Sequence, residues 1–436
     1  MIADTDGFLR FAALSPTAFH AVDGIVKILE QAGYAPLRES EAWRLKPGDR
    51  RYVTRNGPAL IAFRVPGRVD AFRVAAAHTD SPTLKLKELA EDASEHYVRL
   101  NVEKYGGLIL STWLDRPLSV AGRVVVREND GLRVKLVDLG RDAVLIPNVP
   151  IHFNRTVNDG YKFNPQVDML PLYGDGAAKG RLEREIAEAA ETAPERIMGS
   201  DLFLYSRTPG SVWGAENEFF SIGRIDDLEC AWTALAGFLA AEGEETWMPV
   251  YSVFDNEEVG STSKQGADST FLYDVLARAG EALGMTGAET RAAMATGFMA
   301  SADNAHALHP NHPELYDAQN RVYMNGGVVI KHSANQKYTT DGVSSALFTE
   351  VCRQAGVPCQ HFANRSDVLG GGTLGNISNS HVSMNTVDIG LAQLAMHSAY
   401  ETAGTRDIPY MAAALKAFYE MKIRMAGDGS FKLSAY

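Results

Sequence analysis

The sequence predicts an α/β fold in which a mostly parallel sheet is sandwiched by helices and interrupted by a β-rich insertion. From residue 227 onward, apolar strand candidates alternate with amphipathic helices, a rhythm typical of parallel sheets covered by helices. Residues 88–170 differ, because they contain short strands separated by turn signals. Helix and strand patterns also precede this stretch, so we expect one α/β domain built from both ends of the chain.

The first part of the chain predicts one helix and two strands. Ser15 and Pro16 suit an N-cap and a first helical position, and apolar residues then recur at helical spacing as far as Gly33, a suitable C-cap. Strands are expected at 58–65 and 71–77, where apolar residues run continuously.

The insertion is predicted from strand-like segments at 97–102, 124–126 and 132–137, with a turn at Asn129-Asp130-Gly131. A charged helix over 182–191 is expected to be solvated. We therefore divide the chain into an α/β domain, residues 1–87 and 218–436, and a β-rich insertion domain, residues 88–217.

The last part of the chain supplies most of the parallel sheet and its helices. We expect helices near 228–241, 270–280 and 409–425, and strands near 249–254, 297–300, 327–331 and 358–362.

Composition excludes several classes of protein. With 42 Lys+Arg against 54 Asp+Glu, the net charge of −12 argues against a general nucleic-acid role. No apolar run is long enough to suggest a membrane span, and the acidic start of the chain does not resemble a cleavable leader. Cys230, Cys352 and Cys359 are an odd number without a CxxC pair, so we expect reduced thiols and a cytoplasmic protein.

Polar residues with metal-ligand chemistry follow the predicted strands. Ligands bind outside the carboxyl ends of parallel strands, which gives priority to such residues over equally polar residues elsewhere. Their His, Asp and Glu side chains suit Zn²⁺, Mn²⁺ or Co²⁺. They are His78 and Asp80 after strand 71–77, Asp255 to Glu258 after 249–254, Asp303 with His306 and His309 after 297–300, Asp226 and Asp227 before a helix, and His397 on or beside another helix.

Five ligands fit a two-metal site if one carboxylate bridges, and such a pair lowers the pKa of a shared water from 15.7 toward about 7. Asp80 could orient the imidazole of His78. In extended backbone the adjacent Glu257 and Glu258 would point opposite ways, so one could bind metal while the other acts as general base. Spacing alone is also compatible with solvated turns and helix caps that hold no metal.

Other motifs carry less weight. Residues 370–375 fit GxGxxG formally, but neither a convincing strand before them nor a strong helix after them is expected. We therefore reject a dinucleotide site and expect a flexible loop that lines the substrate site. HExxH, P-loop and GxSxG patterns do not occur.

These residues resemble the aspartyl aminopeptidase family of dinuclear zinc metallo-aminopeptidases. The segment FDNEEVGS is the most specific match. The matching segments cover nearly the whole chain: Ser15–Val22, Ala77–Pro82, Tyr105–Gly107, Ser111–Arg116, Phe254–Ser261, Ser301–Ala307, His309–Asn311, Ala334–Gln336, Thr386–Gly390 and Met396–Ser398.

The resemblance implies the role of each candidate residue. Asp226 would bridge two Zn²⁺ ions per subunit, Mn²⁺ or Co²⁺ being possible replacements. His78 and Asp303 would complete the coordination of one ion, and Glu258 and His397 would complete that of the other. The implied general base is Glu257, with Asp80 behind His78.

The resemblance also implies how substrate is bound. Lys331 would lie in the pocket for the N-terminal side chain, where it would favour Asp or Glu. The insertion would serve as a dimerisation and assembly domain. From it, His152 would reach into the active site of a neighbouring subunit and stabilise the oxyanion. The expected partners are peptide substrates and further copies of the chain, with a tetrahedral dodecamer as the assembly, and no nucleic acid or membrane.

Two positions depart from the family pattern. Asp227 stands where Asn is expected, and Tyr400 where many relatives carry Arg, so strict acidic specificity is less secure than aminopeptidase activity. The alternatives are an aminopeptidase of broader or non-acidic specificity, a dinuclear hydrolase of another amide such as an acyl-amino acid, and a non-catalytic assembly protein of the same fold.

Overall fold

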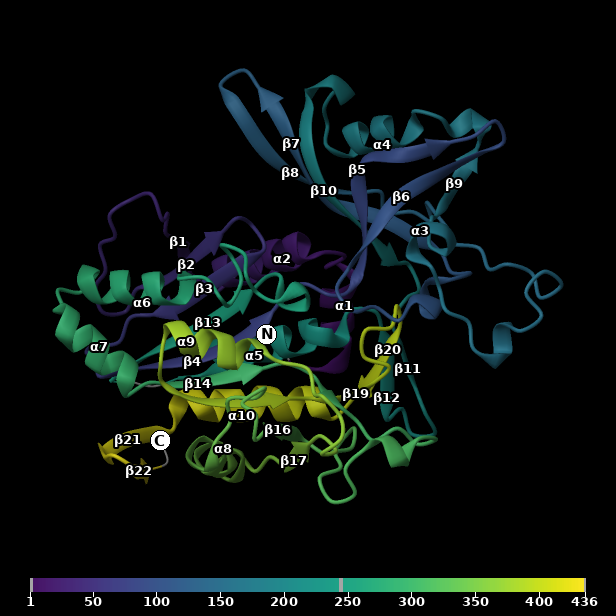
Figure 1. Ribbon diagram of the computed structural model, residues 1–436. Coiled ribbons are helices and arrows are strands. Elements are labelled where there is room, and N and C mark those ends of the chain that lie inside the picture. The colour runs from purple at the N-terminus through teal and green to yellow at the C-terminus, as the bar shows by residue number, and fades with distance from the viewer. Residues whose placement is uncertain (1–2, 243–245, 435–436) are drawn as a thin grey trace.

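The computed structural model describes residues 3–242 and 246–434. It has an α/β part around a nine-stranded sheet and a β-rich part around a six-stranded sheet, and Figure 1 shows the second part standing above the first. The predicted fold class is confirmed, with the refinement that the large sheet is mixed, because strands near both of its ends run antiparallel to a neighbour.

The centre of the large sheet consists of parallel strands. β4 (Ala71–His78) lies between β13 (Trp247–Phe254) and β14 (Phe298–Ala302), and β14 also pairs with β18 (Asn385–Gly390). The outer strands are β1 (Ala35–Pro36), β2 (Arg50–Arg55) and β3 (Ala59–Arg64) beside β13, and β16 (Val328–His332) and β17 (Cys359–Ala363) beside β18.

Helices cover both faces of this sheet, which explains why β4 and β13 are buried along their whole length. Alternation along β4 sends Ala75 and Ala77 into one core and Val74 and Ala76 into the other. The first core contains residues of α1 (Thr5–Ala13), α2 (Ala18–Gln31), α5 (Ile225–Ala240), α8 (Gly342–Ala355) and α10 (Asp407–Glu420), and the second contains residues of α6 (Phe271–Ala282), α7 (Gly287–Ala295) and α9 (Leu374–His381).

The β-rich part is an antiparallel sheet. Its order is β8 (Gly131–Asp138), β7 (Leu118–Glu128), β10 (Ile197–Ser206), β5 (Thr83–Ala93), β6 (Tyr97–Tyr105) and β9 (Leu172–Asp175). The charged helix α4 (Arg181–Ala189) is not simply solvated, as the sequence suggested, because it buries Leu182 and Ile186 in the core of this part. The division at residues 88 and 217 remains a prediction.

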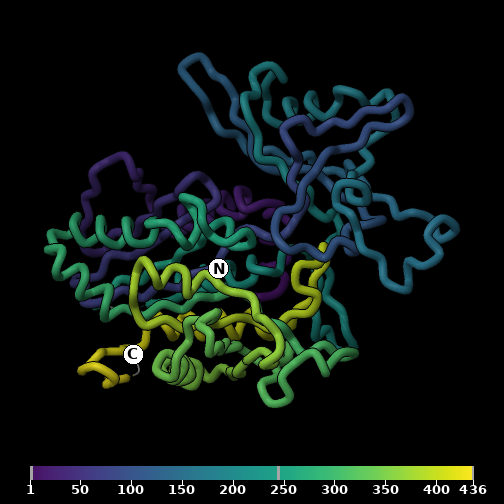
Figure 2. Tube along the Cα trace, in the orientation of Figure 1, coloured from purple at the N-terminus to yellow at the C-terminus, as the bar shows by residue number. Residues whose placement is uncertain are grey.

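A five-stranded sheet lies at the same edge of the α/β part as the end of β4. It contains β11 (Ser211–Trp213), β12 (Phe219–Ile222), β20 (Glu401–Gly404), β19 (Ala392–Leu394) and β15 (Ala305–His306). The long loop between β8 and β9 projects away from the body of the molecule (Figure 2). In the part of the chain that the structure describes, no helix is both long and apolar enough to cross a membrane.

Several elements differ from the sequence-based expectations. The last helix ends at Glu420 rather than 425, because β21 (Lys422–Gly427) turns back to pair with β22 (Ser430–Ser434). The glycine-rich loop at 370–373 is followed by a helix, α9, which the sequence did not predict. Helices α1, α7 and α8 and strand β2 also lie outside the predicted elements.

Candidate metal centre

Three parallel strands deliver the candidate ligands to one edge of the sheet. His78 is the last residue of β4, Glu257 and Glu258 follow β13, and Asp303 follows β14. Asp226 joins them from the start of α5. The sequence suggested that His397 lies on or beside a helix, and this is wrong. His397 lies in the tight loop between β19 and β20, with a positive φ of 68°.

Asp226 lies between the two histidines. Its Oδ1 is 3.6 Å from His78 Nε2 and its Oδ2 is 3.4 Å from His397 Nε2. His397 Nε2 is also 3.4 Å from Glu258 Oε2. One carboxylate oxygen thus faces each imidazole, which is the arrangement that a bridging ligand between two ions requires.

All five predicted ligands lie in overlapping groups that could hold metal ions. Within each group, the possible ligand atoms lie within 4.8 Å of one another. The groups are His78 with Asp226, Asp227 and Asp303; His78 with Glu257 and Glu258; and Asp226 with Glu258 and His397. The sequence analysis named Asp227 among the candidates but did not include it in the set of five ligands.

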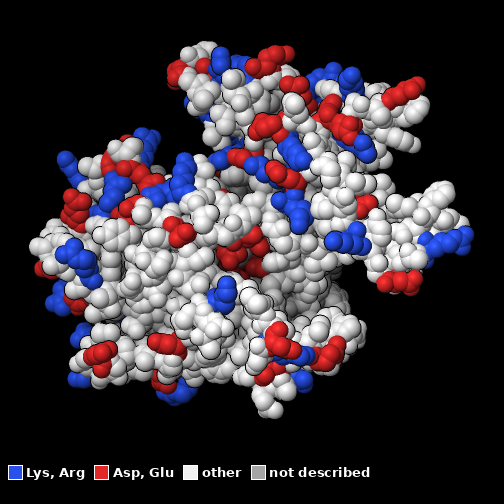
Figure 3. All heavy atoms as spheres, viewed as in Figure 1, with Lys and Arg blue, Asp and Glu red and all other residues white. Residues whose placement is uncertain are grey.

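The chemistry of the cluster fits divalent cations. Asp226 Oδ1 and Glu258 Oε1 are buried and have no hydrogen-bond partner among the described residues. Burial raises the pKa of Asp303 to about 6 and that of Glu257 to about 8, because ionised carboxylates lose hydration there. Figure 3 shows acidic side chains gathered in a central hollow between the two parts of the molecule. Two divalent ions would offset this negative charge.

Asp80 holds the end of β4 and the turn after β13 together. Its Oδ1 is 3.3 Å from His78 Nδ1, and its two oxygens accept the backbone N–H groups of Glu257 and Glu258, both at 3.1 Å. The hydroxyl of Tyr105 donates to Asp80 at 2.7 Å. The expectation of extended backbone at Glu257 and Glu258 is wrong, because Glu257–Val259 form a 3-10 turn stabilised by these bonds.

Glu401, which sequence reasoning missed, links the candidate ligands Asp226 and His397. Its carboxylate accepts backbone N–H groups from Ile225 at 2.6 Å, Asp226 at 3.2 Å and His397 at 2.8 Å. Its sequence signal is weak, since one acidic residue in a short strand, β20, is usually solvated, whereas this one is 1% exposed.

The β-rich part also contacts a ligand directly. His397 Nδ1 lies 3.1 Å from the carbonyl oxygen of Gly107, which follows β6. This bond directs Nε2 of His397 toward Asp226 and Glu258, as expected when the other ring nitrogen is fixed by a hydrogen bond.

Lys331 and His152 occupy very different environments. Lys331, on β16, is 2% exposed, and its Nζ lies 3.7 Å from Asp303 Oδ2 and donates to the carbonyl oxygen of Asn304 at 2.9 Å. His152 lies in an exposed turn of the long loop between β8 and β9 and is in none of the ligand groups. Asp255 and His306 are not in these groups either.

The two departures from the family pattern have separate effects. Asp227 accepts the backbone N–H of His78 at 3.0 Å and adds a carboxylate to the cluster. Tyr400 points elsewhere, because its hydroxyl donates to the carbonyl oxygen of Pro209 at 3.0 Å and lies 2.9 Å from Ser211 Oγ.

A buried His/Asp/Glu cluster at the carboxyl edge of a parallel sheet is an arrangement that suits a metal-dependent hydrolase. The model of the aminopeptidase I zinc metalloprotease family, M18, matches residues 11–419. The chain belongs to this family and is therefore a zinc aminopeptidase, a hydrolase.

Relatives and solved structures match nearly the whole chain. The chain is 45% identical over 423 residues to a probable M18 family aminopeptidase 2 of Clostridium novyi, which covers 95% of this chain and 98% of the relative. A structure of the Ape4 and Nbr1 complex matches with a TM-score of 0.92 and 34% identity over 95% of this chain and 84% of that chain. The mApe1 dodecamer of S. cerevisiae matches with a TM-score of 0.84 and 26% identity over 95% of both chains.

Replacement of Glu401 by Gln should weaken metal binding. The amide cannot accept all the N–H groups that position Asp226 and His397, and loss of such outer contacts lowers metal affinity by roughly 10- to 100-fold. Titration of the metal-free protein with Zn²⁺ would measure the change.

Asp407→Asn is the matched control, because Asp407 is also buried and accepts backbone N–H groups, from Asn325 and Gly327, but holds no candidate ligand. Equal losses in both variants would mean that the effect of Glu401 is general destabilisation.

Proposed function

We propose that this M18 aminopeptidase uses two Zn²⁺ ions per subunit and preferentially removes N-terminal Asp or Glu from peptides. The observation that carries the two-ion proposal is the position of Asp226, with one oxygen toward His78 and the other toward His397. Mn²⁺ or Co²⁺ could occupy the same oxygen and imidazole ligands. The cytoplasmic location remains a prediction.

The proposed ligands fall into two sets that share Asp226. His78 and Asp303 complete one set, and Glu258 and His397 complete the other. Zinc, when bound, supplies Lewis acidity toward water and the scissile carbonyl. Asp80 and Glu401 hold both sets in position, since their carboxylates accept hydrogen bonds from the backbone N–H groups of Glu258, Asp226 and His397.

Glu257 is the proposed general base and acid. Its Oε2 lies 3.9 Å from His78 Nε2, and it is the acidic residue of the turn that is not assigned as a ligand. Burial raises its pKa to about 8, and a pKa near the working pH suits a group that must both accept and release a proton. Glu257 takes a proton from the attacking water and delivers it to the nitrogen of the leaving amine as the peptide bond breaks.

Glu257→Ala should reduce kcat by roughly 100-fold or more, because general acid–base catalysis contributes about 10²–10⁴-fold. Zinc content and thermal stability should stay close to those of the wild type. Hydrolysis of aminoacyl-arylamides by the zinc-loaded variant would test this. Turnover of the variant at the rate of an active wild type would contradict the role assigned to Glu257. A zinc-loaded wild type without activity would instead favour the alternative of an assembly protein.

The acidic preference is proposed to depend on Lys331. Its ammonium is close to the cluster and carries a charge opposite to that of an Asp or Glu side chain. It is paired with Asp303, a proposed zinc ligand, so binding of zinc by that carboxylate would leave the lysine available to substrate. The overall charge of −12 offers no long-range attraction for acidic peptides, and selection must therefore be local.

Lys331→Met should lower kcat/KM for Asp- and Glu-arylamides by roughly tenfold or more, with a much smaller effect on Leu-arylamide, because one buried charge-assisted contact is lost. Lys416→Met on α10, whose lysine pairs with Glu420, is the control and should change neither rate. Equal losses on all substrates would favour the broader-specificity alternative, and cleavage of acyl-amino acids alone would favour the other hydrolase.

The chain is also proposed to form a homo-oligomer, with a tetrahedral dodecamer as the assembly. A structurally similar M18 protein is described as a dodecamer. His152 lies on an exposed loop that projects from the body (Figure 2), where a histidine could enter a neighbouring subunit and stabilise the oxyanion. Activity would then depend on assembly.

Mixing two inactive variants, His152→Ala and Glu257→Ala, should restore activity if His152 acts in a neighbouring subunit. Random exchange of subunits gives intact sites in up to about a quarter of cases. The measurement is arylamide hydrolysis after dissociation and reassembly of the mixture. Failure to regain activity in mixed oligomers that mass spectrometry confirms would count against action between subunits.

A further inference from the structure

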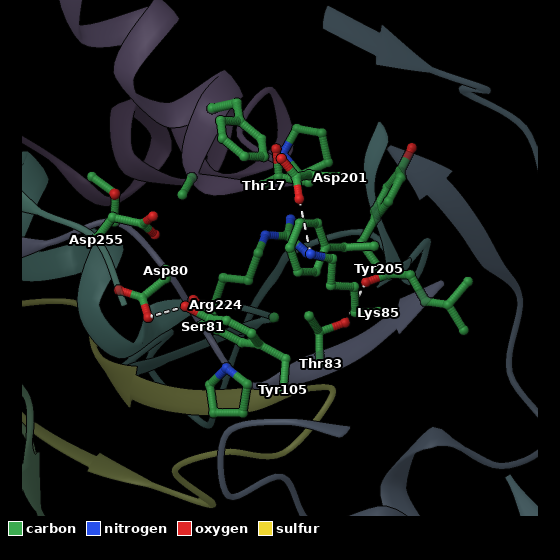
Figure 4. Close-up of a pocket in the computed structure, with 18 of the residues that line it drawn as sticks. Thr17, Asp80, Ser81, Thr83, Lys85, Tyr105, Asp201, Tyr205, Arg224 and Asp255 are labelled. Atoms are coloured by element: carbon green, nitrogen blue, oxygen red, sulfur yellow. Dashed lines mark hydrogen bonds and ion pairs between the residues drawn. The ribbon is translucent and has the colours of Figure 1, made fainter. Parts of the chain in front are cut away.

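A cavity of about 330 Å³ lies between the α/β part and the β-rich part. Its walls come from the start of α2, the connection from β4 to β5, the end of β10 and the residues before α5, and none of the five proposed metal ligands lines it. Figure 4 shows the Lys85–Asp201 ion pair and the Tyr105–Asp80 hydrogen bond on its walls. The volume is in the range of pockets that hold small molecules.

The cavity is lined by three cations and four carboxylates, and one of the cations has no ion-pair partner among the described residues. Lys85 and Arg123 share one carboxylate, Asp201, with both N–O distances at 2.8 Å. Arg224 also lines the cavity but has no carboxylate within ion-pair distance in the described residues. It donates to the carbonyl oxygens of Ser15 at 3.0 Å and Ala12 at 2.9 Å. These oxygens, at the end of α1, carry only partial charges, and Nη1 of Arg224 has no hydrogen bond among the described residues.

Two of the acidic residues on the walls, Asp80 and Glu401, have little capacity left for Arg224. Asp80 accepts from Tyr105 and from two backbone N–H groups, and Glu401 accepts from three backbone N–H groups and from the side-chain amide of Gln393. Asp255 accepts from Gln265 at 3.1 Å. A second donor is also left over, because Trp113, another lining residue, has a buried Nε1 with no partner among the described residues. An unmatched buried donor is costly, and an anionic acceptor would satisfy it.

The rest of the lining is apolar and aromatic. Phe19, Tyr105, Phe203 and Tyr205 contribute rings to the walls. Rings of this kind pack well against a flat or aliphatic hydrocarbon group. An inorganic anion would leave this surface without a partner.

We infer that the cavity binds a small organic carboxylate, whose anionic end is held by Arg224 and whose hydrocarbon body packs against the aromatic walls. Two sources share this chemistry: a free amino acid released by peptide hydrolysis, and an organic acid without an amino group. Asp80 and Glu401 line the same cavity and position the candidate metal ligands. An occupant of the cavity would therefore contact residues that themselves contact the candidate metal ligands.

Calorimetric titration of the zinc-loaded protein with L-glutamate, glutarate, phenylacetate and methyl phenylacetate tests the inference. We expect at least one carboxylate to bind and the neutral ester to bind at least tenfold more weakly than phenylacetate. L-glutamate binding more tightly than glutarate would identify an amino acid as the natural class, and the reverse would identify an organic acid. Equal binding of acid and ester, or no binding of any carboxylate, would overturn the inference.

Arg224→Gln should weaken carboxylate binding roughly tenfold or more, because it removes the charge-assisted contact. Arg73→Gln is the matched control and should bind like the wild type: Arg73 is likewise buried without a carboxylate partner among the described residues, donates to the carbonyl oxygen of Ile423 and lies outside the cavity. Circular dichroism and zinc content would verify that both variants fold.

Ala18→Phe, which places a ring in the cavity, provides a second variant that leaves Arg224 and its helix contacts in place. It should abolish carboxylate binding. Binding that survives both Arg224→Gln and Ala18→Phe would take place at the zinc ions instead, and would refute the cavity as the site.

Discussion

Mutual repulsion among buried carboxylates is the constraint on which the rest of this structure depends. Asp226, Asp227, Glu258 and Asp303 each lie within a few ångströms of His78 or His397, in surroundings where ionised groups are poorly hydrated. Such a cluster is stable only if positive charge lies nearby. His78, His397 and Lys331 supply part of it, and the zinc chemistry of the M18 family supplies the rest.

The scaffold holds these groups against their repulsion by rigid backbone contacts. β4 pairs in parallel on both sides and is covered on both faces, so His78 at its end has little freedom. Asp80 and Glu401 act at the next level, since each accepts backbone N–H groups from residues of the cluster. These two carboxylates direct their charge at the backbone, and they set the spacing of the ligands without occupying a ligand position.

The sequence predicted the fold class and the candidate residues at strand ends because both depend on local patterns, whereas the set of five ligands came from the family resemblance. Apolar runs that end in His78, Asp255 or Asp303 mark the carboxyl edge of a parallel sheet directly. Glu401 could not be found in this way, because its role arises from a fold that brings Ile225 and His397 together from distant segments. Helix α4 was misjudged for a similar reason: its charges are visible in the sequence, whereas the sheet that covers Leu182 and Ile186 is not.

The contact between His397 and Gly107 joins two residues that are 290 positions apart in the chain. Gly107 belongs to the β-rich part and emerges from the ribosome early, whereas His397 and Glu401 emerge only when the chain is almost complete. The proposed second set of ligands therefore cannot form until His397 has been synthesised, even though His78, Asp226 and Glu258 are already present. The order of synthesis alone therefore delays the proposed two-ion centre until almost the whole chain is present.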